Sequence, residues 1–409
     1  MNTSSSKGYT MKRKIFLLLL VCSFSTYSQK FHGLALTPPM GWSTWNTFRG
    51  NINEQLIREA ADAMVSSGMK DAGYRYINLD DYWQGGRDSM GFIFADRAKF
   101  SSGMKALTDY VHSRGLKIGI YSDPGAMTCT GVLGSRGHEY QDALMYAKWG
   151  FDLLKYDWCN TDSLNAYWAY STMRDALYAA GRPMIFYLCE WGNNSPWNWG
   201  KDIGHMWRIS GDIAPCFDCE INHMTYSDWG VMKIVYFREG IRTFSGPDHW
   251  NDFDMLEVGN GMTIGEDRAH FSMWCMLASP LTAGNDIRNM NAETKSILTN
   301  REVIAIDQDS LGIQGFRYDV KDSIETWVKP LTQGDWAICF LNRSMNTKEI
   351  EFNWSKNIVK DDFAKRELNP EKDTYKIRNL WTKKNIGKTN STLKAELDGH
   401  DVLMLRLIK

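Results

Sequence analysis

Acidic residues recur in this 409-residue chain directly after short apolar runs. Carboxylates are almost never buried without a partner, so a group of them at one end of a sheet needs a function or several counter-charges. A helix N-cap explains one such Asp, but it does not explain a series that follows seven apolar runs. Paired carboxylates can protonate a leaving oxygen and attack the sugar or activate water, which is the chemistry of glycoside hydrolysis. The polar residues at these positions are Asp80, Asp81, Asp123, Lys155, Asp157, Glu190, Arg208, Asp212, Asp252, Asp254 and Asp286, accompanied by Trp42, Tyr121 and Trp191.

Other hydrolytic chemistries lack their sequence signatures in this chain. The eight histidines show neither His-x-His nor His-Glu-x-x-His spacing, so they form no recognisable set of metal ligands. No Gly-x-Ser-x-Gly elbow is present, and no Gly-x-Gly-x-x-Gly opens a helix. We therefore expect no metal and no cofactor.

The elements that must position these residues alternate between short apolar runs and amphipathic helical segments from Thr37 to about Leu311. Eight such repeats predict a (β/α)8 barrel, in which the loops after the strands build the active site at one face. The expected strands are Met40–Trp42, Tyr74–Leu79, Leu116–Tyr121, Phe151–Tyr156, Pro183–Leu188, Met206–Ile209, Thr243–Gly246 and Ser279–Ala283, and the expected helices are Asn53–Lys70, Gly103–Ser113, Glu139–Trp149, Leu164–Ala180 and Thr225–Glu239.

The sequence pattern changes after Leu311. Phe316–Lys409 alternates apolar and polar residues between turn residues, which predicts an antiparallel β-sandwich. We expect this domain to be structural, with a sugar-binding face as the alternative. The predicted fold class is α/β: a (β/α)8 TIM barrel over residues 31–311, followed by a C-terminal antiparallel β-sandwich domain over residues 312–409.

The first residues have the pattern of an export signal. Three basic residues, 12–14, precede the apolar run Ile15–Val21, and small residues near Ser28 offer a cleavage site. The run is shorter than the roughly 20 apolar residues that span a bilayer. We expect residues 1–28 to be a signal peptide with Met11 as the true start, and the mature protein to be periplasmic or secreted. A lipid anchor on Cys22 is the alternative, but Val21 fits poorly before it.

The charges nearly balance, with 47 Lys+Arg against 48 Asp+Glu and a net charge of -1. This balance excludes a protein that depends on electrostatic binding to nucleic acid or to an anionic membrane. The 17 Trp suit the apolar faces of sugar rings as well as a core. We expect a small-molecule or glycan partner, no nucleic acid and no membrane span, and the sequence indicates no oligomeric state.

Several ordered motifs resemble those of glycoside hydrolase family 27, the α-galactosidases or melibiases. The match runs from about Thr37 to Asp309, and the remaining chain is similar to the family's C-terminal β-sandwich. The motifs are PPMGWSTWN at 38–46, NLDDYW at 78–83, GIYSD at 119–123, KYDWC at 155–159, CEWG at 189–192, Trp207-Arg208 with Asp212-Ile213, and WNDFDML at 250–256.

The resemblance implies a retaining exo-α-galactosidase that releases terminal non-reducing α-D-galactose by double displacement. Asp157 matches the nucleophile and Asp212 the general acid/base, and retention needs their carboxyl groups about 5–5.5 Å apart. To act as an acid, Asp212 is expected to have a raised pKa in the free protein. The implied sugar contacts are Asp80 and Asp81 to the 4- and 6-hydroxyls, Lys155 to a ring hydroxyl, Glu190 and Arg208 to the 2-hydroxyl, and Trp42, Tyr121, Asp254 and Met255 around the pocket.

Glu190 bears on the choice among related activities. Family members that act on N-acetylgalactosamine carry a small residue there, so Glu190 favours an α-galactoside over the α-N-acetylgalactosaminidase alternative. Intact Asp80 and Asp81 weaken the β-L-arabinopyranosidase alternative, because that sugar lacks the 6-hydroxymethyl group. Asp157 and Asp212 argue against a non-catalytic galactose-binding protein. The natural galactoside stays open among raffinose-type oligosaccharides, galactomannan side chains and glycan caps, and the pH optimum also stays open.

The resemblance also implies a disulfide between Cys129 and Cys159. Cys216 and Cys219 form a single Cys-x-x-Cys, which we interpret as a local disulfide or two free thiols rather than a zinc site. Cys189, Cys275 and Cys339 are expected to be packed thiols.

Two positions depart from the family pattern. Phe253 stands where a proline is usual, and a backbone change there would shift Asp254. Tyr82 stands where many relatives carry a cysteine, so a disulfide common near the N-terminal end is absent.

Overall fold

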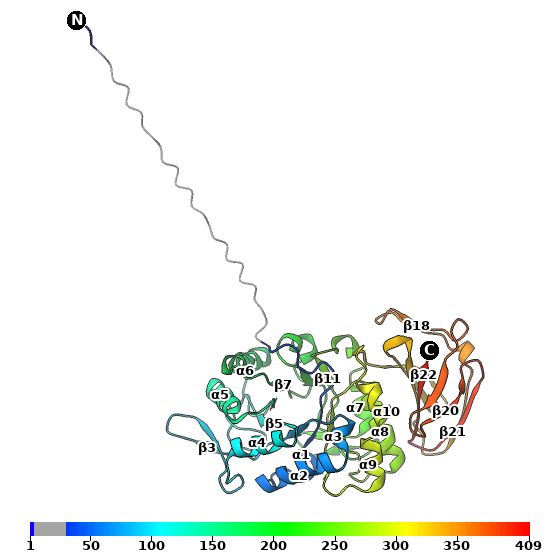
Figure 1. Cartoon of the computed structure of the whole chain (residues 1–409), viewed down its shortest axis with the longest axis horizontal. Helices are drawn as coiled ribbons and strands as arrows, with labels where there is room; N and C mark the ends of the chain where they lie inside the picture. Colours follow the sequence, from blue (N-terminus) through cyan, green and yellow to red (C-terminus); the bar gives the residue numbers. More distant parts are fainter. Residues whose placement is uncertain (4–29) are drawn as a thin grey trace.

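The computed structural model describes residues 1–3 and 30–409. Apart from its first three residues, the expected signal peptide, including Met11 and Cys22, lies outside the described residues. The chain folds into a barrel with a sandwich of β-sheets beside it (Figure 1). No helix within the described ranges has the length and apolar character needed to cross a bilayer.

Eight parallel strands follow one another around the barrel in chain order. The barrel closes just after the seventh strand, where the backbone N–H of Leu256 donates to the carbonyl of Thr282 at 2.7 Å and the N–H of Gly284 donates to the carbonyl of Leu256 at 2.9 Å. The strands are short, mostly buried runs, as expected for a sheet covered on both sides. They are β1 (Met40–Ser43), β2 (Tyr76–Asn78), β5 (Lys117–Ser122), β6 (Leu153–Tyr156), β7 (Ile185–Leu188), β8 (Met206–Arg208), β11 (Trp250–Asp252) and β12 (Leu281–Ala283).

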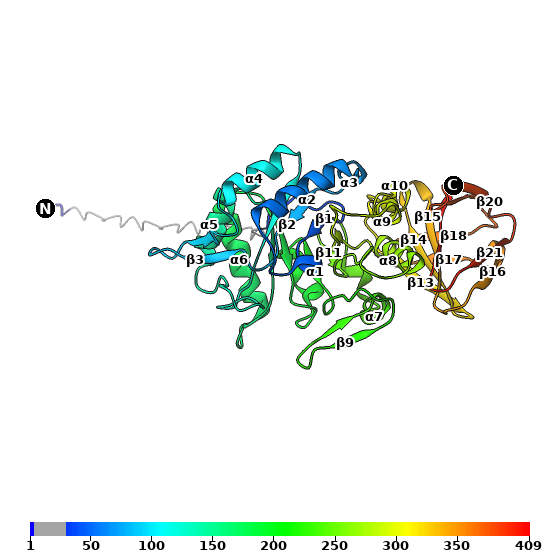
Figure 2. The ribbon, with the colours of Figure 1, turned by 90° about the horizontal axis from the view of Figure 1, so that it is seen from below.

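Helices cover the outside of the barrel, and local chemistry sets their ends (Figures 1 and 2). The side chain of Asn53 caps α2 by accepting from the backbone of Leu56, and Thr263 and Glu266 form a capping box on α8. The helices are α1 (Trp45–Phe48), α2 (Glu54–Ser66), α3 (Met69–Ala72), α4 (Met104–Ser113), α5 (Glu139–Trp149), α6 (Ala166–Ala180), α7 (Val231–Phe237), α8 (Ile264–Met276), α9 (Ala292–Leu298) and α10 (Arg301–Asp307), with short 3-10 turns η1 (Pro196–Asn198), η2 (Gly200–Asp202) and η3 (Ile241–Phe244).

The strand expected at Thr243–Gly246 is wrong. Ile241–Phe244 forms a 3-10 turn instead, and the seventh barrel strand is Trp250–Asp252. Thr243 and Phe244 are good strand formers locally. However, Trp250–Asp252 occupies the seventh position in the barrel sheet, and the side-chain amide of Asn251 donates to the carbonyl of Ile241 at 3.1 Å. Tertiary pairing thus overrides local propensity here.

The helix expected over Thr225–Glu239 is only partly correct. Ser227–Trp229 is strand β10, which pairs with β9 (Glu220–Asn222), and α7 begins only at Val231. A disulfide between Cys216 and Cys219 lies at the base of this hairpin. Gly230 passes so close to both cysteines that a Cβ there would lie 2.6 Å from the backbone of Cys219, and this close approach separates strand from helix.

Helix α8 lies between the barrel and the sandwich. Its residues Ala269–Met276 are all buried, because the barrel covers one side and strands of the sandwich cover the other. Trp327, Cys339 and Met404 of the sandwich belong to the same apolar cluster as the barrel residues. The two units therefore share a continuous core.

The C-terminal unit is antiparallel and has a second apolar core of its own. Its main sheet has the order β13-β14-β15-β22-β19-β20, and two shorter sheets pair β16 with β21 and β17 with β18. The structure thus confirms the predicted fold class of a (β/α)8 barrel with an antiparallel β-sandwich. The strands are β13 (Phe316–Lys321), β14 (Ile324–Pro330), β15 (Trp336–Asn342), β16 (Lys348–Phe352), β17 (Val359–Asp361), β18 (Arg366–Leu368), β19 (Lys376–Asn379), β20 (Lys384–Lys388), β21 (Leu393–Leu397) and β22 (Val402–Ile408), and a further hairpin after β2 pairs β3 (Gln84–Arg87) with β4 (Ile93–Ala95).

Candidate active site

The carboxyl ends of the barrel strands bring the candidate residues to one mouth. Hydrogen bonds and ion pairs join many of them directly, both within one strand-to-loop segment and between different strands. Next to Asp80 and Lys155 the barrel holds a cavity of about 30 Å³, which is too small for a sugar ring. Trp42, Tyr121, Lys155 and Arg208 lie within β1, β5, β6 and β8, whereas Asp80, Asp81, Asp157, Glu190, Asp212, Asp254 and Met255 follow the ends of β2, β6, β7, β8 and β11.

Asp157 follows β6 directly and is 7% exposed. Its Oδ2 accepts the hydroxyl of Tyr121 at 2.8 Å, and its Oδ1 accepts the backbone N–H of Trp158 at 3.1 Å. Burial raises the pKa of Asp157 to about 6; Lys155 opposes this shift, and the negative charge of Asp212 adds to it. The carboxyl group is therefore ionised above about pH 6.

Asp212, four residues beyond β8, has a side chain that is 45% exposed and paired with Arg208. Arg208 Nη2 also lies 2.8 Å from Oδ2 of Asp254. Burial favours the protonated form of Asp212, but the positive charges of Arg208 and then Lys155 outweigh it, so the pKa of Asp212 is lowered. The expected raised pKa of Asp212 is therefore wrong for this structure. Burial raises instead the pKa of Asp254, to about 7.

The two carboxylates after β2 have different partners. Asp80 Oδ2 lies 2.8 Å from the ammonium of Lys155, and both side chains are largely buried. Asp81 Oδ2 accepts the hydroxyl of Thr130 at 2.7 Å, and its Oδ1 accepts the backbone N–H of Tyr82 at 2.8 Å. Burial raises the pKa of Asp81, and the hydroxyl donors oppose that shift. Each carboxylate keeps lone pairs that further hydroxyl groups can use.

Three buried polar atoms at the mouth have no hydrogen-bond partner among residues 1–3 and 30–409: Glu190 Oε1, Arg208 Nε and Asp254 Oδ1. The other oxygen of Glu190 accepts the side-chain amide of Asn194 at 2.7 Å, and burial raises the pKa of Glu190 to about 7. Buried polar groups in native proteins nearly always have a partner. Two acceptors and one donor left open together suit a ligand that carries several hydroxyl groups.

Comparison with known proteins identifies the family. A family model described as "Alpha galactosidase A" matches residues 37–309, and a second, described as "Alpha galactosidase C-terminal beta sandwich domain", matches residues 321–407. The chain belongs to the α-galactosidase family. The "Alpha-galactosidase A" of Cellvibrio japonicus is 54% identical over 388 residues, which are 95% of this chain and 96% of that protein.

Solved α-galactosidase structures are similar along nearly the whole chain. α-Galactosidase I from Mortierella vinacea superposes with a TM-score of 0.83 at 37% identity, over 92% of this chain and 98% of that chain. An α-galactosidase from Saccharomyces cerevisiae with raffinose superposes with a TM-score of 0.84 at 32% identity, over 93% and 99% of the two chains. The barrel and the sandwich are thus both those of the α-galactosidase family.

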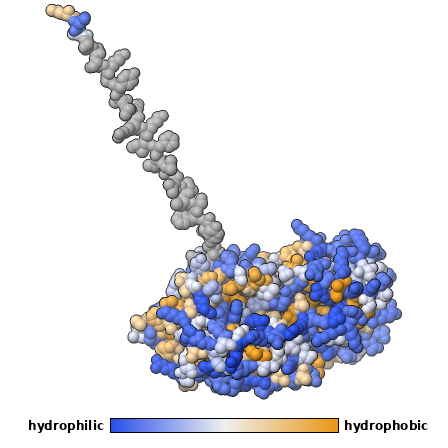
Figure 3. Space-filling view, in the orientation of Figure 1, coloured by the Kyte–Doolittle hydropathy of each residue, from blue (hydrophilic) through white to orange (hydrophobic). Residues whose placement is uncertain are grey.

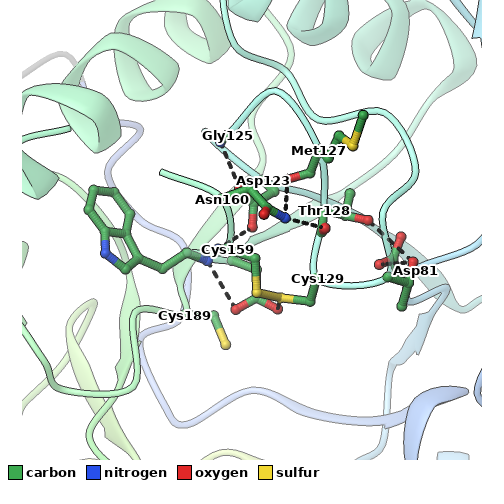
Figure 4. Close-up of a disulfide and its surroundings, with 12 residues drawn as sticks. Asp81, Asp123, Gly125, Met127, Thr128, Cys129, Cys159, Asn160 and Cys189 are labelled. Atoms are coloured by element: carbon green, nitrogen blue, oxygen red, sulfur yellow. Dashed lines mark hydrogen bonds between the residues drawn. A yellow bond between two sulfur atoms is a disulfide. The ribbon is translucent and has the colours of Figure 1, made fainter. Parts of the chain in front are cut away.

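The loop after β5 lies beside Asp81 and the segment after β6 (Figure 4). A disulfide joins Cys129 of that loop to Cys159 after β6, as the resemblance implies. Asp123 accepts the backbone N–H groups of Gly125 at 2.6 Å and Cys159 at 2.7 Å, which fixes the two loops against each other. Asp123 and the two sulfur atoms have the spacing of metal ligands, but the sulfur atoms are bonded to each other and offer no thiolates.

The remaining cysteines match the expected alternatives. Cys216 and Cys219 form a local disulfide. Cys189, Cys275 and Cys339 are free and buried, as expected for packed thiols.

The structure shows two contacts that sequence reasoning missed, one of Asp286 and one of Thr130. Asp286, which follows β12, binds Arg288 at 2.8 Å, and Arg288 also binds Glu59 on α2 at 2.6 Å, so this acid has a counter-charge that the sequence did not indicate. Thr130 was missed as the partner of Asp81. Its position next to the disulfide cysteine was the available signal, but the distance to Asp81 in the chain hid the contact.

Proposed function

We propose that the protein is a retaining exo-α-galactosidase that hydrolyses terminal α-D-galactose from oligosaccharides or glycans by double displacement. Membership of the family supports the reaction class. One observation supports the residue assignment most directly: Asp157 and Asp212 follow β6 and β8 at the same end of the barrel, and the charge of Asp212 acts on the pKa of Asp157.

In the proposed first step, Asp157 attacks the anomeric carbon as a carboxylate. The bond between that carbon and the leaving oxygen breaks, and Asp212 gives its proton to that oxygen. In the second step Asp212 takes a proton from water, the water oxygen attacks the anomeric carbon, and Asp157 leaves as a carboxylate. Two inversions at one carbon return the original α configuration.

Asp212 must gain a proton before it can act as an acid. We propose that a bound galactoside raises the pKa of Asp212 in two ways. The leaving group covers the exposed part of its side chain, which extends the burial that already favours the protonated form. The 2-hydroxyl of the sugar also competes for Arg208, whose charge now lowers that pKa.

The proposed sugar contacts follow the open hydrogen-bonding groups. Asp80, Asp81 and Lys155 bind ring hydroxyls, Glu190 and Arg208 bind the 2-hydroxyl, and Trp42, Tyr121, Asp254 and Met255 surround the ring. Glu190 is buried and bound to Asn194, and we propose that it fills the volume that an acetamido group would need. We therefore propose an α-galactoside over an α-N-acetylgalactosaminide or a β-L-arabinopyranoside as the substrate. Oligosaccharides of the raffinose type are proposed substrates because a relative was solved with raffinose.

We further propose that the protein is exported. Its two disulfides persist in oxidising compartments such as the periplasm or the extracellular space.

The test follows the first sugar released from an aryl α-galactoside by proton NMR. Retention gives α-galactose first, and β-galactose as the first product would refute the double displacement. Asp157→Ala should abolish turnover of every galactoside. Asp212→Ala should spare aryl galactosides with good leaving groups far more than natural sugars. Asp286→Asn is the matched control, because Asp286 follows another barrel strand but binds Arg288 and Asn289 rather than a candidate site residue, so the substitution should leave both activities intact.

A further inference from the structure

We propose that Arg343 of the C-terminal sandwich is a positioning residue for Asp212 and acts through the disulfide loop Cys216–Cys219. This inference rests on the proposed role of Asp212 as the acid/base. It gives the sandwich a part in the reaction in addition to its part in the stability of the fold. The loop is the single Cys-x-x-Cys motif of the chain, which the proposed reaction steps do not use.

The sandwich contacts the barrel unit in two ways. Met404 and its neighbours pack into the shared apolar core, which stabilises the fold. Arg343 and His400 instead contact the disulfide loop, a few residues after Asp212. In Figure 2, α7 and the base of the β9 hairpin lie on the side of the barrel next to the sandwich. Hydrophilic residues predominate on the sandwich surface in Figure 3, as expected for a face in contact with water.

Backbone hydrogen bonds hold the segment of Asp212 against strand β10. The N–H of Trp229 donates to the carbonyl of Asp212 at 2.8 Å, and the N–H of Ala214 donates to the carbonyl of Trp229 at 2.8 Å. Between them, the N–H of Ile213 donates to Asp254 Oδ2 at 2.7 Å. The side chain of Asp212 is 45% exposed, so its position follows from its backbone and its ion pair rather than from packing. A shift of β10 would therefore move the acid/base.

The disulfide loop holds the end of strand β10. Three consecutive backbone N–H groups after the strand donate to carbonyls of the loop. The donors are Gly230, Val231 and Met232, and their acceptors are Cys219, Cys216 and Phe217 at 2.8, 3.0 and 3.0 Å. The disulfide closes the loop over a sequence separation of only 3, so we expect the loop to move as a unit. Because Gly230 directly follows Trp229, a displaced loop would also displace the contact with Asp212.

The two residues between the cysteines, Phe217 and Asp218, both bind the sandwich. Arg343, directly after β15, donates to Asp218 Oδ2 at 2.7 Å, and its guanidinium lies 5.3 Å from the ring centroid of Phe217. His400, between β21 and β22, stacks on the same ring at 4.1 Å. Phe217 is buried, whereas the side chain of Asp218 is 57% exposed, so the ion pair alone contributes little. Arg343 therefore holds the loop by a charge and by a buried ring together.

Arg343 is itself fixed on the sandwich. Its backbone N–H donates to the carbonyl of Ser323 at 2.8 Å, and its side chain is 20% exposed. Its guanidinium also lies 5.1 Å from the ring centroid of Tyr236 on α7. Truncation of this side chain at Cβ would therefore remove a hydrogen bond to the loop and two cation–π contacts at once.

The experiment compares a substrate that needs the proton of Asp212 with one that does not. Methyl α-galactoside needs it, because methoxide is a poor leaving group, whereas fluoride leaves α-galactosyl fluoride without a proton. kcat/KM covers only the steps up to departure of the leaving group, so the ratio of the two values isolates the acid role of Asp212. Arg343→Ala should lower kcat/KM for the methyl glycoside by about tenfold relative to the fluoride, because general-acid catalysis depends steeply on the position of the donor.

Further variants test the path and its specificity. Cys216→Ala with Cys219→Ala opens the loop and should shift the ratio in the same direction. Arg343→Lys keeps the charge but not the planar group, so its ratio should fall between those of Arg343→Ala and the unmodified protein. Arg378→Ala is the matched control, because Arg378 on β19 binds Glu302 on α10 by two hydrogen bonds of 2.6 Å, a contact between sandwich and barrel that does not involve the loop. It should leave the ratio unchanged.

Two results would overturn the positioning role of Arg343. One is an equal loss on both substrates, or no loss, after Arg343→Ala, because a purely structural role would not distinguish the two leaving groups. The other is an equal shift of the ratio after Arg378→Ala. If the unmodified protein hydrolysed neither substrate, or if Asp212→Ala left the ratio unchanged, the proposed function itself would be wrong, so the two failures are distinguishable.

Discussion

The charge of the residues at the mouth is governed by one arginine. Arg208 is 1% exposed and is shared between Asp212 and Asp254. It lowers the pKa of Asp212, whereas burial raises the pKa of Asp157 to about 6 although Lys155 opposes that shift. In the free protein the proposed nucleophile, Asp157, therefore has a higher pKa than the proposed acid, Asp212. The reaction needs the opposite order, with Asp157 ionised and Asp212 protonated. Substrate binding must change that order before the first bond breaks.

The pH dependence of an activated substrate tests the state of Asp157. The fluoride of α-galactosyl fluoride leaves without a proton, so kcat/KM should depend mainly on ionised Asp157, rise with pH through about 6 and then level off. Asp212→Asn should move this midpoint to lower pH, because the negative charge of Asp212 is one cause of the raised pKa. Asp286→Asn should leave it in place. If the midpoint of the pH profile were unchanged in the Asp212→Asn variant, the two carboxyl groups would not interact.

Thr130 should act as a positioning residue for Asp81. Thr130→Val keeps the shape but removes the hydroxyl that Asp81 accepts at 2.7 Å, so kcat/KM for α-galactosides should fall by about tenfold, as for other hydrogen bonds to charged groups. The loss should grow toward low pH, because this hydroxyl opposes the raised pKa of Asp81. Thr130→Ser should restore most of the activity. If Ser were as impaired as Val, packing of the methyl group rather than the hydrogen bond would be responsible.

Two disulfides link elements around the mouth, and they differ greatly in the sequence separation of their cysteines. The bond between Cys129 and Cys159 joins the loops after β5 and β6 with a sequence separation of 30, whereas Cys216 and Cys219 are separated by 3. The first therefore fixes two strands of the barrel relative to each other, and the second fixes only the base of one hairpin.

The two disulfides should differ in their effect on stability. In the chain-entropy model, Cys129→Ala with Cys159→Ala should lower the free energy of unfolding by about 3–4 kcal/mol, because a loop of about 30 residues is no longer closed. Cys216→Ala with Cys219→Ala is the matched pair and should lower it by about 2 kcal/mol or less. Denaturant unfolding under non-reducing conditions measures both. Equal losses would mean that loop closure is not the main contribution.

The whole molecule depends on the shared core between its two units. Met404 of β22 is fully buried among barrel residues that include helix α8, so neither unit can separate without exposing apolar surface. The domain boundary proposed near residue 311 therefore separates two types of fold. We do not expect the barrel or the sandwich to fold without the other.

Substitution of Met404 should destabilise barrel and sandwich together. Met404→Ala should cost about 2–5 kcal/mol, as for other buried methionines, and loss of activity and loss of β-sheet circular dichroism should coincide along a denaturant titration. Met345→Ala is the control, since Met345 lies on the same unit with 79% exposure and should change stability by no more than about 0.5 kcal/mol. Separate transitions for activity and sheet content would show that the units unfold independently.

Local patterns were sufficient for most elements of this chain. Amphipathic periodicity predicted helices such as α5 (Glu139–Trp149), and short apolar runs predicted seven of the eight barrel strands. The failures were at Thr243–Gly246 and Thr225–Glu239. There, pairing with distant strands and a local disulfide outweighed the propensities of the residues themselves.

The order of the motifs along the chain determined the family and brought the candidate residues to one mouth, because the carboxyl ends of parallel strands meet at one face of a barrel. Only the tertiary structure decided which charges pair there. Arg208 binds Asp212 as well as Asp254, Thr130 donates to Asp81, and Asp286 pairs with Arg288. The physical reason is that a pKa or a hydrogen bond depends on distances through space between loops, and the spacing of residues along the chain does not contain those distances.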